Sequence, residues 1–256
     1  MLVTPAGEAL IARARALLRG ADDLLSAARA FEDPLAGTLK LGVIPTISPY
    51  LLPDVARALR KELPNLELVF VEDKTSVLVS KLERGELDAA LLALEADLGD
   101  LERLPIARDP FVLAVPRDHR LAKRKQAVKT GELTGEQVLL LDDGHCFRDQ
   151  ALSYCERAKV EELGFRATSL ATLTQMVAGG RGVTLLPSLA IPIENRRGDL
   201  TILRLTAPEP ARTLGLAFRP GSPLKARFAK VAEVIGQAAQ PALANQPRTR
   251  ERRAPV

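Results

Sequence analysis

The alternation of short apolar runs with amphipathic stretches is the feature that most limits how this chain can fold. From Leu39 onward, segments rich in valine, isoleucine and leucine alternate with segments whose apolar residues recur at helical spacing. In a first series we expect strands at 39–44, 66–72 and 87–94, with helices at 51–63 and 76–84 between them. This order is typical of βαβ units and predicts an α/β protein with mainly parallel sheets.

A second series of the same kind follows. It holds expected strands at 111–115, 137–143, 182–187, 200–205 and 213–218, and expected helices from about residue 147, at 169–178 and at 222–239. Neither an internal repeat nor a low-complexity linker separates the two series, so we expect two small domains joined by strands that cross between them. Ligands of such folds lie at the carboxyl ends of strands, in the cleft.

A helix is expected before the first strand. Thr4-Pro5 is a typical helix start, and Asp33-Pro34 ends the pattern after residue 31. Apolar residues repeat every seven positions along it, and an alanine follows each of the first three by four positions: Leu10, Leu17, Leu24 and Phe31, with Ala14, Ala21 and Ala28. This spacing predicts a short coiled-coil seam. The alternative is that the stripe packs against its own domain.

Composition excludes the membrane and disordered classes. The chain has 256 residues, 46% of them hydrophobic, and no apolar run approaches the thickness of a bilayer. The N-terminus lacks the cationic flank and apolar core of a secretory signal, so we expect a cytoplasmic protein. In that reducing compartment a pair of cysteines is more often redox-active than structural.

Most of the net charge of +4 lies at the C-terminus. Residues 241–256 hold Arg248, Arg250, Arg252 and Arg253 against a single acid, Glu251. The stretch has no apolar periodicity, which predicts a disordered basic tail. The alternative is that this tail binds nucleic acid. The rest of the chain lacks tryptophan and any interleaving of basic with aromatic residues, so it predicts no nucleic-acid surface of its own.

The chain has two cysteines, Cys146 and Cys155, and no set of metal ligands at zinc spacing. Cys146 follows the apolar run 138–141 and precedes an expected helix. A thiol at a helix N-terminus, with His145 and Arg148 beside it, is expected to favour its thiolate form. The alternative is an inert, buried cysteine.

The interval to Cys155 adds a geometric constraint. Nine positions along a helix correspond to about 13 Å of rise and about half a turn out of phase. A disulfide needs Cα atoms within about 7 Å. If 147–155 is helical in the reduced protein, closing the bridge requires that the segment unwind, as in a switch.

The run Gly144-His-Cys-Phe-Arg-Asp-Gln-Ala-Leu-Ser-Tyr-Cys155 resembles the peroxide-sensing segment of the hydrogen-peroxide-sensing LysR-type transcriptional regulators. The resemblance extends through 42–46, 49–53, 165–170 and 219–224, covers nearly all of residues 2–240, and includes the more general LysR pattern at 4–8. It implies two periplasmic-binding-protein-like subdomains joined by crossover strands and preceded by a linker helix. The implied boundaries are 1–34 for the linker helix, 35–114 plus 216–240 for subdomain I, and 115–215 for subdomain II with the cysteines.

The resemblance implies a redox-sensing activator of antioxidant genes rather than an enzyme. By this resemblance, hydrogen peroxide is expected to oxidise Cys146 stoichiometrically to a sulfenic acid, which then forms a disulfide with Cys155. Refolding between the two cysteines changes the geometry of a homodimer or homotetramer. The implied partners are hydrogen peroxide, further copies of the chain and a thiol reductant such as glutaredoxin or thioredoxin. No metal or other cofactor and no membrane is implied.

The site residues implied by the resemblance are Cys146, Cys155, His145, Arg148, Thr46, Asp149, Thr75 and Arg212. Thr46, His145 and Arg148 are donors of the type that stabilises a departing oxygen, and Asp149 is expected to orient Arg148 by a charge-assisted pair. The alternative roles are structural. Thr46 and Thr75 are then helix caps and Asp149 is a first-turn acid that favours the helix dipole. His119, among charged neighbours, is expected to be a solvated loop residue.

LysR-type regulators carry an N-terminal winged helix-turn-helix, and we expect none in this sequence. DNA and RNA polymerase are therefore expected as partners only of the full-length protein. The main alternative function is a LysR-type domain that binds a metabolite in the cleft and has incidental cysteines. A thiol peroxidase is disfavoured because no CxxC or reductase docking motif is present. A solute-binding protein of transport is disfavoured because no signal peptide is seen.

Overall fold

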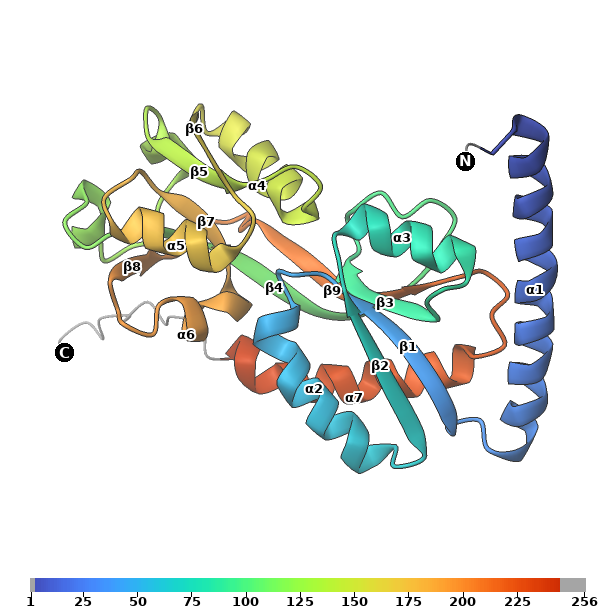
Figure 1. Ribbon diagram of the computed structural model, residues 1–256. Helices are drawn as coiled ribbons and strands as arrows, with labels where there is room; N and C mark the ends of the chain where they lie inside the picture. The colour runs from blue at the N-terminus through green and yellow to red at the C-terminus, as the bar shows by residue number, and fades with distance from the viewer. Residues whose placement is uncertain (1–2, 245–256) are drawn as a thin grey trace.

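The computed structural model describes residues 3–244, and the greater part of the expected basic tail lies outside them. Two lobes and one separate long helix make up the molecule (Figure 1). In the first lobe a sheet of three parallel-paired strands is covered by two helices: β1 (Gly37–Val43), β2 (Leu66–Glu72), β3 (Ala89–Ala93), α2 (Ser48–Glu62) and α3 (Thr75–Arg84). Each strand and each helix lies where the first series of the sequence predicts it.

The second lobe contains four strands and three helices: β5 (Gln137–Leu141), β6 (Glu161–Ala167), β7 (Thr184–Pro187), β8 (Leu200–Leu203), α4 (Cys146–Arg157), α5 (Leu170–Ala178) and α6 (Ile191–Glu194). Strands β5 and β6 form a parallel pair, with α4 as the connection between them. The sequence pattern does not predict β6 or α6. Every other element of this lobe begins within about three residues of its expected position.

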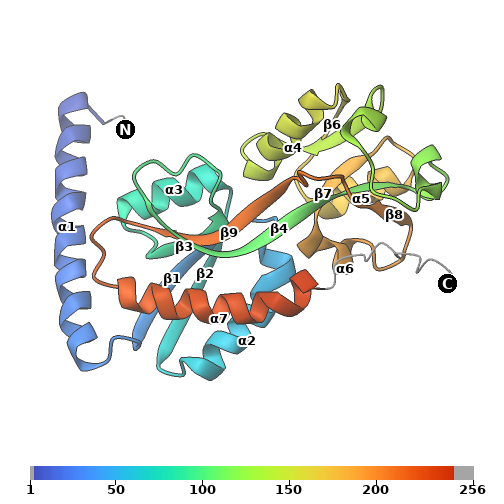
Figure 2. The same ribbon diagram turned by 180° about the vertical axis from the view of Figure 1, so that it is seen from behind.

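Two long strands connect the lobes, as Figure 2 shows from behind. They are β4 (Glu102–Pro116) and β9 (Ala211–Phe218), which pair antiparallel to each other. Residues 102–110 of β4 pair with β9, whereas residues 111–116 pair with β7 and β8 in the second lobe. In the described residues three strand pairings are parallel and four are antiparallel. The expectation of mainly parallel sheets is therefore wrong, because the crossover strands run against their neighbours.

Helix α1 (Pro5–Glu32) lies at the end of the molecule away from the second lobe, where it contacts α3 (Figures 1 and 2). The side chains of Leu10, Leu17 and Leu24 are 68%, 78% and 72% exposed. The alternative that this stripe packs against its own domain is therefore wrong for these three leucines. The side chain of Phe31 lies outside what the structure describes.

The final helix, α7 (Lys225–Ala244), packs against α2 and β4 and covers the first lobe. It begins three residues after its expected start at 222 and runs past the expected end at 239. Within residues 3–244, no helix combines the length and the apolar character needed to cross a bilayer.

Candidate functional site

Helix α4 begins at Cys146, directly after a tight turn that leaves strand β5. Gly144 has φ of 86°, a left-handed conformation that glycine adopts without strain, and it turns the chain so that His145 becomes the residue before the helix. Cys146 is therefore the first helical residue, at the positive end of the helix dipole. This is the junction that the sequence predicts for the thiol.

A cavity of about 370 Å³ lies beside the Cys146 thiol. Thr75 lines it from the first lobe, and Asp149 and Gln150 line it from α4. The Thr75 hydroxyl and both polar atoms of the Gln150 amide are buried and have no hydrogen-bond partner among the residues described. The thiol thus shares its cavity with unpaired polar groups, an arrangement that suits a small polar molecule.

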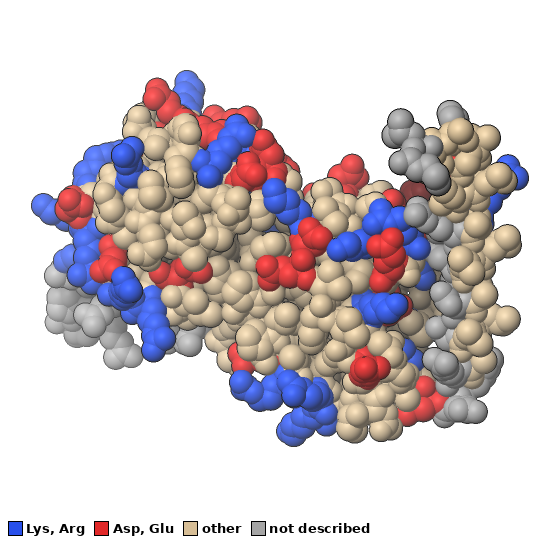
Figure 3. Space-filling view, viewed as in Figure 1, with Lys and Arg blue, Asp and Glu red and all other residues tan. Residues whose placement is uncertain are grey.

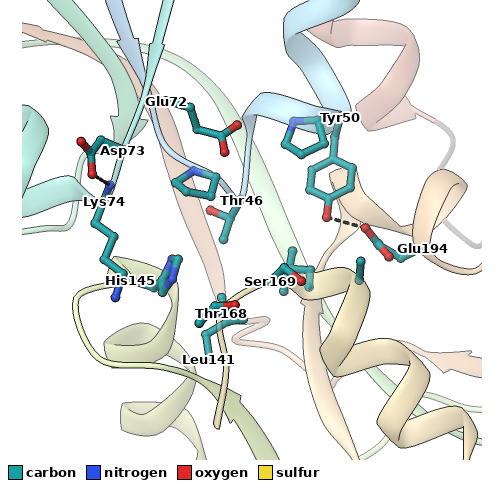
Figure 4. A pocket seen from close by; sticks show the side chains of 14 residues that line it. Thr46, Tyr50, Glu72, Asp73, Lys74, Leu141, His145, Thr168, Ser169 and Glu194 are labelled. Atoms are coloured by element: carbon teal, nitrogen blue, oxygen red, sulfur yellow. Dashed lines mark hydrogen bonds between the residues drawn. The ribbon is translucent and has the colours of Figure 1, made fainter.

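A second cavity, of about 430 Å³, is lined by residues of both lobes, among them Thr46, Lys74 and His145. Figure 4 shows Lys74 and His145 at one side of it and Tyr50 and Glu194 at the other. The Tyr50 hydroxyl donates to the Glu194 carboxylate at 2.6 Å, which joins α2 of the first lobe to α6 of the second. The consecutive residues His145 and Cys146 line different cavities: His145 lines the larger one and Cys146 the smaller one.

Thr46 belongs to a buried network centred on Arg212. The Arg212 guanidinium donates to the Thr46 hydroxyl at 2.7 Å and to its carbonyl at 2.9 Å, and it forms an ion pair with Asp109 at 3.0 Å. Arg212 also lies 5.8 Å from the centre of the Phe147 ring. Because Phe147 follows Cys146, this network connects Thr46 to the start of α4.

The two threonines do not cap helices. Ile47 precedes α2, and no side-chain cap bond is present there, so the capping alternative for Thr46 is wrong. Lys74 precedes α3, and Thr75 is its first residue without a side-chain cap bond, so the capping alternative for Thr75 is wrong as well. The side chains of both threonines line cavities instead.

Arg148 is held by partners other than the expected one. Its guanidinium is nearly buried and donates to Asp143 at 2.9 Å and to Glu162 at 2.9 and 3.1 Å, with a further bond to the Leu141 carbonyl. The prediction that Asp149 orients Arg148 by a charge-assisted pair is therefore wrong. Asp149 is an exposed first-turn acid of α4, as its alternative role requires. Glu162 and Asp143 raise the pKa of Arg148 and balance its charge.

His145 is almost buried, and its Nε2 atom has no hydrogen-bond partner in the described part of the chain. Burial lowers the pKa of this imidazole, and the nearby Lys74 ammonium lowers it further, against the opposing effect of Asp142. The neutral ring is therefore favoured. The expectation that a positively charged His145 favours the Cys146 thiolate is therefore not supported by the surroundings of this ring.

Cys155 lies in the tenth position of α4 and is 3% exposed. Burial raises the pKa of its thiol to about 12, and the carboxylates of Glu162 and Glu156 act in the same direction. Neither cysteine is bonded to the other. The segment between the cysteines is helical, which is the condition on which the unwinding argument depends.

The structure thus divides the predicted residues into groups. Cys146, Thr75 and Asp149 line one cavity, Thr46 and His145 line the next, and Arg148 and Arg212 anchor the surrounding backbone from outside both. Sequence reasoning misses Gln150, although it lies in the motif one turn after Cys146, and it misses Lys74 and Glu162, for which no pattern exists.

One further difference concerns His119. His119 is not a solvated loop residue: it contacts Glu136 at 3.1 Å and accepts from the Leu121 amide at the start of a short 3-10 helix.

Figure 3 shows acidic and basic side chains next to one another where the lobes meet, on a surface otherwise covered largely by uncharged residues. In the residues that the structure describes, no cluster of three or more potential metal ligands is present.

Comparison with known proteins gives consistent matches. The family model described as LysR substrate binding domain matches residues 32–240. The DNA-binding transcriptional dual regulator OxyR of Escherichia coli is 43% identical over 236 residues, which are 92% of this chain and 77% of that protein. The probable hydrogen peroxide-inducible genes activator of Mycobacterium leprae is 43% identical over 239 residues, covering 93% of this chain and 76% of the relative.

Solved structures agree with these matches. The oxidized form of OxyR has a TM-score of 0.73 and 44% identity, and the reduced form has 0.74 and 43%; each covers 81% of this chain and 98% of its own. A hydrogen-peroxide-bound cysteine mutant of Corynebacterium glutamicum OxyR has a TM-score of 0.81 and 35% identity, covering 95% of this chain and 77% of its own.

Proposed function

The chain belongs to the LysR substrate-binding domain family, and on that basis we propose that it is the peroxide-sensing regulatory domain of an OxyR-like transcription activator. Its relatives include proteins named as hydrogen peroxide-inducible genes activators, in line with a regulator rather than an enzyme. The observation that carries the proposal is the position of Cys146. It is the first residue of α4 and lines a cavity together with Thr75 and Gln150, whose buried polar side-chain atoms have no hydrogen-bond partner among the residues described.

The chemistry proposed has two steps. In the first, the Cys146 thiolate attacks one oxygen of hydrogen peroxide, the O–O bond breaks, and a sulfenic acid and hydroxide form; the hydroxide takes up a proton and leaves as water. The unpaired Thr75 hydroxyl and Gln150 amide are donors within the same cavity for the departing oxygen. His145 directly precedes Cys146, and its lowered pKa favours a neutral ring that could exchange protons during this step.

In the second step the Cys155 sulfur attacks the sulfenic sulfur, an S–S bond forms and water leaves. Both cysteines lie in α4, about 13 Å apart along its axis by the helical rise, whereas a disulfide requires Cα atoms within about 7 Å. The bridge therefore requires that much of α4 unwind. Cys155 is buried with a raised pKa, so it reacts only after the segment opens.

The wider proposal follows the resemblance and the relatives. The domain acts stoichiometrically in the cytoplasm, assembles as a homodimer or homotetramer, and reaches DNA and RNA polymerase through a full-length regulator. A thiol reductant such as glutaredoxin or thioredoxin resets it. The exposed leucines of α1 support self-association, since an apolar stripe of this kind is stabilised by a second helix. The boundaries near residues 114 and 215 fall within β4 and β9, and they form part of the proposal.

Intact mass under denaturing, alkylating conditions tests the proposal. Before treatment both thiols should be alkylated. After one equivalent of hydrogen peroxide, both alkylation sites should be lost together, with a mass decrease of about two hydrogens for the disulfide. Retention of both sites under these conditions would overturn the proposed function.

A second candidate function is a metabolite-binding domain with incidental cysteines. The cavity of about 430 Å³ between the lobes, lined by Thr46, Tyr50 and Lys74, is of the size of small-ligand sites and favours this alternative. A protein of this second kind would keep both thiols after peroxide treatment, so the same mass experiment separates the two candidates.

A further inference from the structure

The turn that carries the thiol is held from both lobes. Its own lobe holds it through Asp143, which accepts from Arg148 at 2.9 Å and from Arg166 at 2.6 Å. From the first lobe, Lys74 reaches across: its Nζ atom donates to the Asp143 carbonyl at 2.7 Å and lies 3.5 Å from the Asp142 carboxylate. Lys74 directly precedes α3, so its backbone is fixed by a regular element.

The aliphatic part of Lys74 fits against the same turn. A Cβ atom placed on Gly144 would lie 3.1 Å from Cδ of Lys74, so the absence of a side chain there lets the lysine pass close to the backbone. The Lys74 side chain is 35% exposed, and its ammonium bonds the residue just before Gly144. The fit combines packing of the stem with a charge-assisted bond at its end.

Lys74 also contributes to the electrostatics of the His145 imidazole. The two residues line the same cavity, and the pKa of His145 is lowered first by burial and further by the charge of Lys74, against the effect of Asp142. The other titratable groups lining this cavity are the carboxylates of Glu72 and Asp73, and Tyr50 with Glu194 at the far side.

From these contacts we propose that Lys74 is a positioning residue for the Cys146 thiol: from the opposite lobe it seats the 142–145 turn that sets the start of α4 and the orientation of His145. This proposal rests on the proposed function, because the reaction that Lys74 supports is the oxidation of Cys146. It adds a residue outside the peroxide motif, and it gives the first lobe a direct effect on the reactivity of a thiol in the second.

The test compares four forms of the chain: wild type, Lys74→Met, Lys74→Arg and Lys225→Met. Methionine keeps the stem of Lys74 and removes the ammonium, and arginine restores a donor with positive charge. Lys225 is the matched control. Its ammonium forms an ion pair with the Glu102 carboxylate at a distance of 2.7 Å, and neither residue belongs to the lobe that carries the cysteines. Two quantities are measured: the rate of dimedone-trapped sulfenic acid formation on Cys146 with excess hydrogen peroxide, and the pKa of His145 by NMR titration.

We expect Lys74→Met to slow sulfenic acid formation about tenfold, the scale on which small losses of reactive geometry act. We expect it to raise the pKa of His145; the other histidine of the chain, His119, serves as the internal reference in the NMR spectra. Lys74→Arg should retain most of the rate, and Lys225→Met should behave as wild type. An unchanged oxidation rate in Lys74→Met overturns the positioning role, even if the pKa of His145 moves.

Failure of the proposed function gives a different result. If wild-type Cys146 does not react with hydrogen peroxide at all, the peroxide-sensing proposal fails. In that case the rate at which a general thiol-alkylating reagent modifies Cys146 is measured in place of the rate of oxidation by hydrogen peroxide. Equal alkylation in wild type and Lys74→Met then overturns the positioning role separately.

Discussion

Cys146 and Cys155 are the first and tenth residues of one continuous helix, and both are buried without being bonded to each other. The reduced state is thus defined by a regular structure that separates the two thiols by more than a disulfide permits. In the proposed mechanism this relationship couples formation of the disulfide to unwinding of α4. The free energy of the reduced helix therefore enters directly into the redox equilibrium of the pair.

The two cysteines should have distinct roles. Cys146→Ser is expected to abolish consumption of hydrogen peroxide, because the remaining Cys155 is buried and its raised pKa disfavours the thiolate. Cys155→Ser is expected to consume one equivalent and to stop at a sulfenic acid. Dimedone labelling followed by peptide mass spectrometry assigns the modified residue. Preferential labelling of Cys155 in the wild type would reverse these two roles.

Oxidation should change backbone protection locally. Amide hydrogen exchange across α4 is expected to increase in the disulfide-bonded protein, since the intrahelical hydrogen bonds of residues 147–155 must break. Strands β1 and β3 are internal references and should be unaffected, because their residues are paired on both sides in the first lobe. Equal exchange over α4 in fully reduced and fully oxidised samples would contradict the unwinding mechanism.

The ion pair between Arg148 and Glu162 should stabilise the reduced form. Glu162→Gln removes a carboxylate that accepts two bonds from a nearly buried guanidinium, and it is expected to destabilise reduced α4 by about 1–2 kcal/mol. Because unwinding releases this pair, the reduction potential should fall by roughly 20–45 mV. Equilibration against glutathione buffers measures the reduction potential of the cysteine pair. The neighbouring exposed Glu161→Gln is the matched control, and an equal shift in both variants would argue against the pair.

The buried thiol of Cys155 predicts a dependence of stability on pH. Its pKa rises from 9.0 to about 12 on folding, so the stability that it supports is complete below pH 9 and is lost as the pH rises toward 12. Relative to Cys155→Ala, the reduced wild type should lose up to about 1.4 kcal/mol per pH unit in this range. Urea unfolding under reducing conditions at pH 8, 9 and 10 gives the comparison. Parallel pH profiles for the two proteins would be inconsistent with a buried, neutral thiol.

The α1 leucines should contribute to self-association. Replacing Leu10, Leu17 and Leu24 by serine removes an exposed apolar stripe and is expected to weaken the oligomer at least tenfold without unfolding the lobes. Sedimentation equilibrium measures the association constant, and circular dichroism checks the fold. Substitution of Ala14, Ala21 and Ala28 by serine is the milder control. An unchanged association constant after the leucine replacements would place the interface elsewhere.

The strand and helix periods predict most of the fold because each element satisfies its own pattern locally. The exception of β6 has a physical reason: residues 161–167 are Glu-Glu-Leu-Gly-Phe-Arg-Ala, and most of their side chains are exposed or half-buried, so no apolar run marks the strand. The antiparallel crossover follows from the pairing of β4 with β9. That pairing joins residues about a hundred positions apart, and no local pattern specifies it.

The candidate site is predictable to the extent that it lies in one motif. The position of Cys146 at a helix start and the separation of the two thiols follow from a short stretch of sequence. The Thr46 partner is Arg212, which lies 166 positions away, and the partners of Arg148 come from the preceding turn and from β6. Carboxylates in a sequence are interchangeable on charge alone, which is why the pairing of Arg148 with Asp149 is the wrong choice.

The ion pair of Asp109 with Arg212 has a consequence for how the domain transmits a signal. Both side chains are completely shielded from water, one on β4 and the other on β9, the two strands that the lobes share. Asp109 and Arg212 are directly opposite each other in the pairing of β4 with β9, at the point where β4 passes on to pair with β7. Removing one partner of a buried ion pair costs about 3–5 kcal/mol, so we expect this junction between the lobes to be rigid. We therefore expect oxidation to leave the arrangement of the two lobes unchanged and to change only the surface that α4 forms. In the proposed oligomer, neighbouring subunits would then contact a changed surface on an otherwise unchanged domain.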